Sequence, residues 1–330
     1  MTKRKAAKRE ETESFVLEFR SHLLAWFDEN KRDLPWRKDR DPYRVWLSEI
    51  MLQQTRVAAV IDHYKRFLER FPTVEKLARA RESTVLAAWS GLGYYRRARM
   101  LHAAAKKVVS DFNGHFPSTA EGLRLLPGIG RYTSAAIASI AFDQPAAVVD
   151  GNVERVLQRV AGEVLAGEPL WQKAQELVSP GRAGDFNQAM MELGATVCSP
   201  RQPKCLFCPV SAQCATRGEM KGTGKTSRQN KRELRYAFHS QNGSVFLVQR
   251  PIEASLMPGM WELPEMPTKS VSEAAWLTLR HSITVTDYVV RVVKHEAPEE
   301  ATGQWVRKGR LTKLPLTGLT RKILHAAKVI

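Results

Sequence analysis

Apolar residues recur at the spacing of an α-helix through the first two thirds of the chain. Between residues 15 and 27 they occupy positions 15, 17, 19, 23, 24 and 27, which predicts a helix. The same period predicts further helices over residues 43–55, 57–71, 73–80, 83–89, 96–112, 118–125, 153–161, 171–179 and 186–197, with an Ala- and Ile-rich helix after Thr133. This part of the chain is therefore predicted to be all-α.

The hydrophobic period changes after residue 235. Residues 236–239 and 244–249 read as two strands on either side of Asn242-Gly243, a pair that favours a two-residue β-hairpin turn. Further strands are predicted over residues 284–293 and 304–306, and helices over residues 272–281 and 319–327. We therefore expect a separate α+β domain over residues 236–330.

Two charged segments flank these predicted domains. Residues 1–13 are first basic and then mixed in charge, and we expect them to form a disordered tail. Residues 216–235 are rich in Lys, Arg, Gly and polar residues, and they read as an exposed basic linker.

The overall charge favours a polyanionic partner. The 330 residues contain 51 Lys and Arg against 34 Asp and Glu, a formal net charge of +17, and such an excess promotes phosphate contacts with release of counterions. The basic start leads into no apolar signal segment, and the apolar stretches are shorter than the roughly 20 residues that span a bilayer. We expect an intracellular protein without membrane contact, whose cysteines are reduced unless they bind a metal.

A glycine-rich turn precedes the Ala- and Ile-rich helix. Its sequence is Leu126-Pro127-Gly128-Ile129-Gly130-Arg131-Tyr132-Thr133. Gly128 and Gly130 allow positive φ and let another backbone approach closely. Because the following helix adds the partial positive charge of its N-terminus, the turn suits a phosphate. Asp150 follows an apolar run twenty residues after Gly130 and stands just ahead of another helix.

A second carboxylate, Glu49, breaks the pattern of its helix. Asp41-Pro42 is typical of a helix start, with Asp as the N-cap and Pro as the first helical residue. Along the helix, Val45, Trp46 and Leu52 surround Glu49 on its own face. Burial raises the pKa of a carboxyl group, as a general acid near neutral pH requires. A structural glutamate paired with an arginine, such as Arg37 or Arg56, is the alternative that this pattern favours.

The turn over residues 90–97 combines glycine, tyrosine and arginine. Its sequence is Ser90-Gly91-Leu92-Gly93-Tyr94-Tyr95-Arg96-Arg97. Such a turn can present an aromatic wedge and cations to DNA. A plain helix–helix turn with both tyrosines packed inward explains the same residues equally well.

All four cysteines lie within 17 residues. Cys198, Cys205, Cys208 and Cys214 have the spacing C-x6-C-x2-C-x5-C in a proline-rich loop. Four thiols so close together can hold one metal centre. An intracellular protein disfavours disulfides, whereas zinc and an iron–sulfur cluster both remain open.

These segments together resemble the helix–hairpin–helix superfamily of DNA glycosylases, and most closely its MutY-type adenine DNA glycosylases. The resemblance covers nearly all of residues 14–330. The motifs that carry it, beside the glycine turn and the four cysteines, are Leu34-Pro35-Trp36-Arg37, Ser48-Glu49-Ile50-Met51-Leu52-Gln53-Gln54-Thr55-Arg56-Val57, Gly91-Leu92-Gly93-Tyr94-Tyr95, Val149-Asp150-Gly151-Asn152-Val153 and Phe186-Asn187-Gln188-Ala189-Met190-Met191.

The resemblance implies removal of adenine mispaired with 8-oxoguanine or guanine in double-stranded DNA. Glu49 would protonate the flipped adenine and later handle the attacking water, while Asp150 would stabilise the positively charged sugar. Two carboxyl groups in different environments can hold these opposite protonation states, and the base must leave the stack before the bond is reached. Tyr132 and Asn152 match family positions in the same pocket. The cysteines would bind one 4Fe–4S cluster.

The resemblance also implies a domain layout and a set of DNA contacts. The glycosylase region would cover residues 14–215, with a helical-barrel part over about 41–145 and a cluster-bearing part formed by 14–40 and 146–215. A MutT-like (Nudix-like) recognition domain would follow the 216–235 linker. The expected DNA-contacting residues are Arg37, Leu52, Gln54, Arg56, Tyr94, Gly128, Gly130, Ser282 and Thr284. We expect a monomeric, cytoplasmic protein of bacterial type, associated with the nucleoid, whose linker contacts other repair proteins.

Tyr132 distinguishes the alternatives within the superfamily. Where the endonuclease III branch has a nucleophilic lysine, this chain has Tyr132, and no lysine lies between Lys107 and Lys173. Schiff-base chemistry at this position is therefore excluded. A mismatch thymine or uracil glycosylase resembles only the first domain, and a DNA-binding scaffold without catalysis would not need the full set of catalytic residue types.

The C-terminal domain departs from its family pattern twice. Gly259-Met260-Trp261-Glu262-Leu263-Pro264 is its best match to the MutT-related fold, but Ser272-Glu273-Ala274-Ala275 replaces the R-E-x-x-E-E core of a pyrophosphatase, so we expect no nucleotide hydrolysis. The family's Phe-Ser-His loop, which inspects 8-oxoguanine, aligns with Ile283-Thr284-Val285 after His281-Ser282. A hydroxyl is kept there, but the histidine is lost unless His281 replaces it from two residues earlier. The preference for 8-oxoguanine over guanine is therefore the part of the implied function that this sequence supports least.

Overall fold

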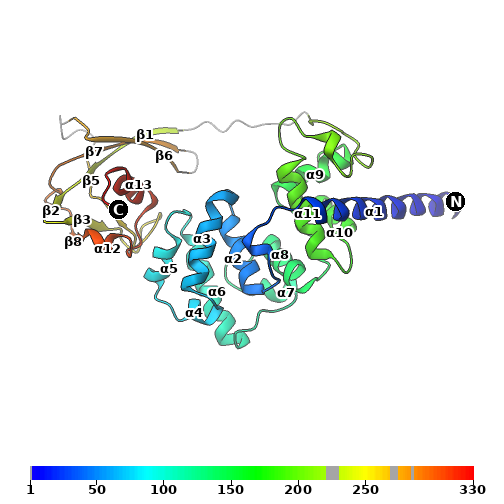
Figure 1. The fold of residues 1–330 in the computed structure, drawn as a ribbon, viewed down its shortest axis with the longest axis horizontal. Helices are drawn as coiled ribbons and strands as arrows, with labels where there is room; N and C mark the ends of the chain where they lie inside the picture. The colour runs from blue at the N-terminus through cyan, green and yellow to red at the C-terminus, as the bar shows by residue number, and fades with distance from the viewer. Residues whose placement is uncertain (1, 221–229, 268–273, 284–285) are drawn as a thin grey trace. The chain divides into compact units, whose positions relative to one another are not determined.

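A computed structural model describes residues 2–220, 230–267, 274–283 and 286–330. The chain forms two compact units (Figure 1). The first unit comprises Met1–Lys65, Thr73–Glu75 and Ala103–Thr223, and the second comprises Arg66–Pro72, Lys76–His102 and Gly224–Ile330. In the part of the chain that the structure describes, no helix is long and apolar enough to cross a membrane.

The chain up to residue 220 is helical, as predicted from its hydrophobic period. Its α-helices are α1 (Thr2–Asn30), α2 (Pro42–Leu52), α3 (Val57–Arg70), α4 (Val74–Ala78), α5 (Glu82–Trp89), α6 (Arg96–Phe112), α7 (Ala120–Leu123), α8 (Arg131–Phe142), α9 (Gly151–Ala161), α10 (Gly167–Leu177) and α11 (Ala183–Thr196), and its 3₁₀ turns are η1 (Pro35–Arg37) and η2 (Cys205–Phe207). The predicted start of α2 is confirmed, since Asp41 caps it and Pro42 is its first residue.

The N-terminal segment differs from the disordered tail that we expected over residues 1–13. In the structure, residues 2–13 are the first turns of α1. The segment is rich in Ala, Glu, Lys and Arg, which have high helix propensity. Because the buried part of α1 already supplies a helical nucleus, adding these residues requires no second nucleation step.

One apolar core joins α1, α9, α10 and α11 in the first unit. Phe19, Leu23 and Phe27 of α1 are buried against Phe186 and Leu193 of α11. Arg20 secures α10 to α1 because its guanidinium donates hydrogen bonds to the carbonyls of residues 176, 177 and 178 at 2.7–3.1 Å. These carbonyls lie at the end of α10, where helical carbonyls lack intrahelical partners.

Close packing of α11 on α9 depends on a glycine. A Cβ atom built on Gly194 would lie 2.6 Å from the Cβ of Asn152 and 3.0 Å from its carbonyl oxygen. Gly194 is fully buried, so the two backbones can approach only because this position has no side chain. The contact determines how far the first turn of α9 lies from α11.

The C-terminal part of the second unit is an α+β fold with two sheets, which confirms the predicted class. Its elements are β1 (Asn230–Ala237), β2 (Ser240–Gln241), β3 (Ser244–Gln249), β4 (Trp261–Glu262), β5 (Glu265–Met266), β6 (Leu277–Ile283), β7 (Thr286–Val293), β8 (Gly303–Arg307), α12 (Lys308–Leu311) and α13 (Gly318–Ala326). One sheet has the order β5-β1-β7-β6, with β1 parallel to β7. In the other, β3 pairs with β2, β4 and β8. Val245, Leu247, Val290, Val292 and Ile323 lie in the core.

Three boundaries in this region test the sequence predictions. The turn Asn242-Gly243 is confirmed, since both residues have positive φ and connect β2 to β3. The predicted helix over residues 272–281 is wrong from Leu277 onward, where β6 begins. Its side chains alternate between partly buried and exposed, as pairing with β7 requires. Residues 230–235, which we assigned to the linker, pair with β7 as the first part of β1.

Replacing Gly194 by alanine is expected to lower the free energy of unfolding by about 1–3 kcal/mol, because the new Cβ overpacks the contact between α9 and α11. Urea unfolding of the full chain measures this change. Gly151→Ala is the matched control, since a Cβ at Gly151 would meet nothing within 4 Å. Equal destabilisation by the two substitutions would contradict this account of the packing.

Candidate active site

A cavity of about 540 Å³ lies in the first unit, among α2, α8, α9, α11 and η1. Its wall includes four residues that the sequence analysis assigned to the chemistry, namely Glu49, Tyr132, Asp150 and Asn152. The structure therefore brings together residues that are up to about a hundred positions apart in the sequence.

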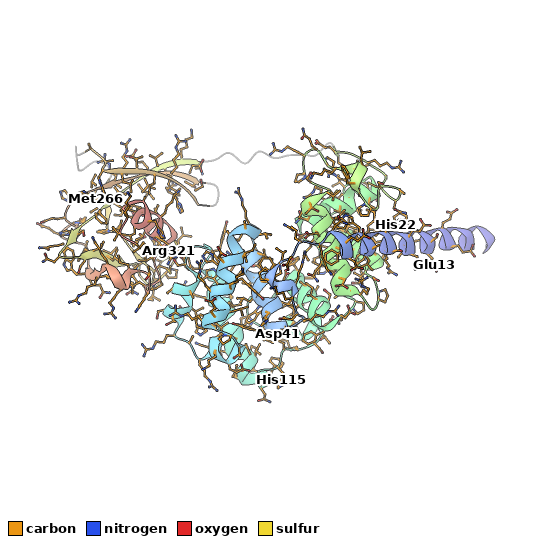
Figure 2. All side chains as sticks on the ribbon, in the orientation of Figure 1. Glu13, His22, Asp41, His115, Met266 and Arg321 are labelled. Atoms are coloured by element: carbon orange, nitrogen blue, oxygen red, sulfur yellow. The ribbon has the colours of Figure 1, made fainter. Side chains whose placement is uncertain are left out.

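Helix α2 carries Glu49 into this cavity. Asp41 accepts a hydrogen bond from the backbone N–H of Arg44 at 2.9 Å and begins the helix; Figure 2 labels Asp41 at this end of α2. Two turns later Glu49 is only 6% exposed, between the buried Trp46 and Ile50. Burial raises the pKa of Glu49 to about 7, and the nearby charge of Asp150 adds to the rise, which Tyr132 and Arg37 oppose.

Tyr132, in the first turn of α8, is the hydrogen-bond partner of Glu49. Its hydroxyl donates to Oε2 of Glu49 at 2.8 Å and lies 3.4 Å from Sδ of Met191. Burial raises the pKa of Tyr132 well above its ordinary value, and the charges of Glu49 and Asp150 raise it further. The phenol therefore stays protonated and acts as a donor toward Glu49.

Asp150 has an opposite environment at the start of α9. Its Oδ1 accepts hydrogen bonds from the backbone N–H groups of Asn152 and Val153 at 2.9 and 2.7 Å, and its Oδ2 accepts one from Nδ2 of Asn152 at 3.0 Å. Asp150 is thus the N-cap of α9, where the helix dipole favours a negative charge. The capping role and the expected catalytic role are compatible.

Asn152 connects Asp150 to the cysteine loop. Its Oδ1 accepts a hydrogen bond from Nη2 of Arg155 at 2.8 Å, and Nε of Arg155 donates to the carbonyl of Cys198 at 2.8 Å. Arg155 also donates to the carbonyl of Gly194 at 2.6 Å. Helix α9 therefore holds Asp150 at one end and contacts the cysteine loop along its length.

Glu192 is a residue of this cavity that sequence reasoning missed. It is 1% exposed on α11 and binds Nε of Arg32 at 2.6 Å and Nη2 of Arg37 at 2.9 Å. Burial by itself would raise the pKa of Glu192, but the hydrogen bonds and charges of Arg32 and Arg37 outweigh it and lower the pKa. The sequence pattern that could have identified Glu192 is the one that identified Glu49, an acidic residue among apolar residues of a helix.

Arg37 lines the cavity wall, where its donors are occupied. Beside Glu192, it donates to Oε1 of Gln188 at 3.1 Å and to the carbonyl of Arg32 at 3.2 Å, and its side chain is 14% exposed. Arg37 therefore forms its ion pair with Glu192, and on Glu49 it acts through its charge, which favours the ionised form of that carboxyl group. Its expected contact with DNA stays a prediction.

The two glycines of the glycine turn have different backbone conformations. Gly128 has a φ of 76°, in the left-handed region that glycine allows. Gly130 has a φ of −90° and is the N-cap of α8. A Cβ on Gly130 would meet nothing within 4 Å. The exposed glycine therefore leaves the N-terminus of α8 open to a close approach from outside.

The remaining expected DNA contacts do not form one group. Leu52 and Gln54 line the cavity, and Gln54 has a left-handed φ of 54°. Arg56 is exposed at the start of α3, outside the cavity wall. Tyr94 belongs to the second unit, as does Ser282, whose hydroxyl donates to Asp287. Thr284, and Val285 beside it, lie outside the described residues.

The four cysteines line a second cavity of the first unit. Cys198, Cys205, Cys208 and Cys214 surround it as free thiols, together with Arg159 and Ser211. Nη1 of Arg159 lies 3.3 Å from Sγ of Cys198, and the backbone N–H of Arg217 lies 3.4 Å from Sγ of Cys214. Within the described ranges, no three His, Cys, Asp or Glu side chains converge as ligands of a single ion.

Comparison with known proteins places the site in a family of repair proteins. Residues 47–176 match the family described as HhH-GPD superfamily base excision DNA repair protein. The adenine DNA glycosylase of Mus musculus is 55% identical over an alignment of 214 residues, and the match covers 60% of this chain and 42% of that protein. The adenine DNA glycosylase of Arabidopsis thaliana is 40% identical over an alignment of 325 residues, and the match covers 83% of this chain and 51% of that protein. The chain thus spans about half the length of these relatives.

Solved structures extend the comparison. The structure of a thermostable thymine-DNA glycosylase is 33% identical, with a TM-score of 0.59, and the match covers 62% of this chain and 98% of that one. A structure of endonuclease III bound to DNA matches at 23% identity with a TM-score of 0.53, which shows a shared fold. From the near-complete match to the thymine-DNA glycosylase and the family match across the cavity, the chain belongs to the HhH-GPD superfamily of base excision DNA repair proteins.

Proposed function

We propose that this chain is a monofunctional DNA glycosylase that hydrolyses the N-glycosidic bond of adenine mispaired with 8-oxoguanine or guanine. The observation that carries the proposal is the pair of carboxyl groups in one cavity, in opposite environments. Glu49 is buried and has a pKa of about 7, whereas Asp150 accepts three hydrogen bonds at a helix N-terminus. Glycosidic bond cleavage needs such an acid and such a carboxylate.

Glu49 is suited to the protonation of the leaving base. Adenine leaves as a neutral molecule only if it gains a proton while its bond to C1′ of the sugar breaks. A carboxyl group with a pKa near 7 is half protonated at neutral pH and is still acidic enough to transfer its proton. The glutamate that results can then accept a proton from the water that adds to C1′, which restores the starting state.

Asp150 is suited to the charge on the sugar. As the glycosidic bond breaks, positive charge develops on C1′ and the ring oxygen, and a fixed carboxylate stabilises it. The hydrogen bonds from Asn152 and Val153 orient Asp150 before the substrate binds, so the carboxylate need not reorganise during the reaction. Asn152 is thereby a positioning residue.

The cavity wall supports hydrolysis over lyase chemistry. A lyase of this superfamily attacks the sugar with a lysine, and Tyr132 occupies the matching position. Its phenol is held by Glu49 and remains protonated, so it supplies a hydrogen bond and no nucleophile. Among the residues that line the cavity in the described chain, none is a lysine.

Double-stranded DNA is the partner that this reaction requires. The exposed turn at Gly128 and Gly130 can approach a phosphate, and the net charge of +17 favours the polyanion. Arg56, Tyr94, Ser282 and Thr284 are proposed as further contacts. The C-terminal domain would inspect the base opposite adenine. We further propose that the protein acts as a monomer and that its basic linker contacts other repair proteins.

Thymine or uracil excision is the second candidate, because the solved structure of a thymine-DNA glycosylase matches 62% of the chain. The comparisons favour adenine for two reasons. The relatives named adenine DNA glycosylase are more similar, at 55% and 40% identity. The match to the Arabidopsis protein covers 83% of the chain.

The cysteine cavity fits a 4Fe–4S cluster held by Cys198, Cys205, Cys208 and Cys214. All four cysteines line one cavity, and the guanidinium of Arg159 and the N–H of Arg217 lie next to the sulfur atoms of Cys198 and Cys214. Donors of this kind stabilise thiolates that bear a cluster's negative charge. Such a cluster would hold together the loop after α11, which Arg155 and Arg159 of α9 contact, and zinc is the rival metal.

A panel of DNA duplexes that carry different mispairs tests the proposed activity. In single-turnover assays, the full chain is expected to release adenine opposite 8-oxoguanine and guanine, with neither thymine nor uracil released from G mispairs. Glu49→Gln and Asp150→Asn are each expected to slow adenine release at least about a hundredfold, since one removes the acid and the other the stabilising charge.

Asp41→Asn is the matched control for Asp150→Asn, because Asp41 also caps a helix but lies outside the cavity. This control distinguishes the effect of changing a helix N-cap from the effect of removing a negative charge from the cavity. Wild-type rates for Asp150→Asn, or a comparable loss for Asp41→Asn, would contradict the assigned role.

The pH dependence of adenine release reports the state of Glu49. Because its protonated form is the active acid and its pKa is about 7, the single-turnover rate is expected to fall as pH rises through about 7. Tyr132→Phe removes a hydrogen bond that favours the ionised carboxylate, so the pKa rises and the falling limb moves to higher pH. A limb that stays in place or moves to lower pH would show that Tyr132 has another role.

Metal content distinguishes an iron–sulfur cluster from zinc. Protein purified without oxygen is expected to absorb broadly in the blue region of the visible spectrum and to contain about four iron atoms per chain, as one 4Fe–4S cluster requires. Cys205→Ser is expected to lose both signals, whereas Ser211→Ala, which changes a non-thiol residue of the same cavity, retains them. Stoichiometric zinc without iron would refute the cluster.

A further inference from the structure

The turn between α5 and α6 holds a tyrosine in an unfavourable backbone conformation. Gly91 and Gly93 have positive φ angles of 107° and 68°, and Tyr94 follows with a φ of 47°. A residue with a bulky side chain rarely adopts this left-handed region, so its surroundings must impose it. The side chain of Tyr94 is nevertheless 48% exposed, and burial of its own ring does not explain the conformation.

Arg97 makes the contacts that hold this turn. Its Nη2 donates hydrogen bonds to the carbonyls of Leu92 and Gly93, at 3.0 and 3.3 Å. The backbone N–H of Arg97 donates to the carbonyl of Tyr94 at 2.8 Å. The guanidinium binds the carbonyls of the two residues before Tyr94, so Arg97 fixes the peptide planes that determine where Tyr94 points.

The guanidinium of Arg97 also lies against two aromatic rings. Its Cζ is 5.5 Å from the ring centroid of Trp89 and 5.4 Å from that of Tyr94, within the range of a cation–π contact. Trp89 is completely buried, and its Nε1 donates to the same Gly93 carbonyl at 3.1 Å. Through Arg97, the exposed Tyr94 ring is thus connected to a core residue.

We propose that Arg97 is the residue that positions Tyr94 for insertion between DNA bases, and that it promotes base extrusion in this way. The inference rests on the proposed function, because extrusion matters only if the protein acts on a base within a duplex. A side chain inserted between two base pairs unstacks them. It can do so only if its own orientation is fixed. The guanidinium is engaged with the turn and half-buried, so its role differs from that of a phosphate contact such as the exposed Arg96 could make.

Arg97→Lys tests the proposal in the full chain. Lysine keeps the charge but loses the planar fork that binds two carbonyls and lies against the rings. With 2-aminopurine in place of the mispaired adenine, fluorescence rises when the base leaves the stack. Arg97→Lys is expected to reduce this rise, and single-turnover adenine release, by about five- to tenfold, in line with loss of charge-assisted hydrogen bonds. The salt dependence of DNA binding should not change.

Two further variants show whether Arg97 acts through Tyr94. Arg96→Lys is the matched control, since it makes the same change at the neighbouring exposed position and is expected to leave extrusion as in the unchanged protein. In a Tyr94→Ala background, Arg97→Lys is expected to have no further effect on extrusion. A residue with only a structural role would cause the same loss whether or not Tyr94 is present. Thermal unfolding confirms that each variant is folded at the assay temperature.

The outcomes separate this inference from the proposed function. Unchanged extrusion in Arg97→Lys, or an equal loss in the Tyr94→Ala background, would overturn the role of Arg97. Extrusion of 2-aminopurine without adenine release would contradict the proposed glycosylase and still decide the role of Arg97. If the unchanged protein neither extrudes nor releases a base, both proposals fail.

Discussion

The transfer of one carboxyl group out of water is the constraint on which the active site depends. The rise in the pKa of Glu49 from an ordinary 4.5 to about 7 corresponds to roughly 3 kcal/mol in favour of the protonated form. Since the folded-state pKa is the higher one, this penalty on folding is absent below the unfolded pKa, grows as pH rises and is complete above about 7. The fold tolerates the cost because α1, α9, α10 and α11 share a large apolar core.

The same helices give Asp150 the opposite environment. Its carboxylate occupies the N-terminus of α9, where backbone N–H groups and Asn152 satisfy it. Close contact of Gly194 with Asn152 brings α11, which carries Met191 and Glu192, next to this helix end. The absence of a side chain at residue 194 is therefore a condition of the cavity geometry, because a wider spacing would move Asp150 and Asn152 away from α11.

Patterns formed by residues close together in the sequence were enough to predict most of the fold and part of the candidate site. The period of apolar residues identified the helices, and an acid among apolar neighbours identified Glu49. Glu192 shows the same pattern, but its partners lie more than 150 positions away and could not be paired from the sequence. Residues 277–281 were taken for a helix because their strand character comes from pairing with β7. The sequence could not tell which glycine of the turn uses positive φ, because glycine permits that conformation without requiring it; Gly128 adopts it and Gly130 does not.

Glu192 explains how two arginines can lie in the wall of a cavity in which the pKa of Glu49 is raised. A positive charge favours the ionised form of a nearby carboxyl, and Arg37 does lower the pKa of Glu49. Glu192, however, accepts hydrogen bonds from both Arg32 and Arg37, and its negative charge offsets theirs. Because its own pKa is lowered, this compensation persists at neutral pH. The cavity wall can thus contain two guanidinium groups while burial still dominates the pKa of Glu49.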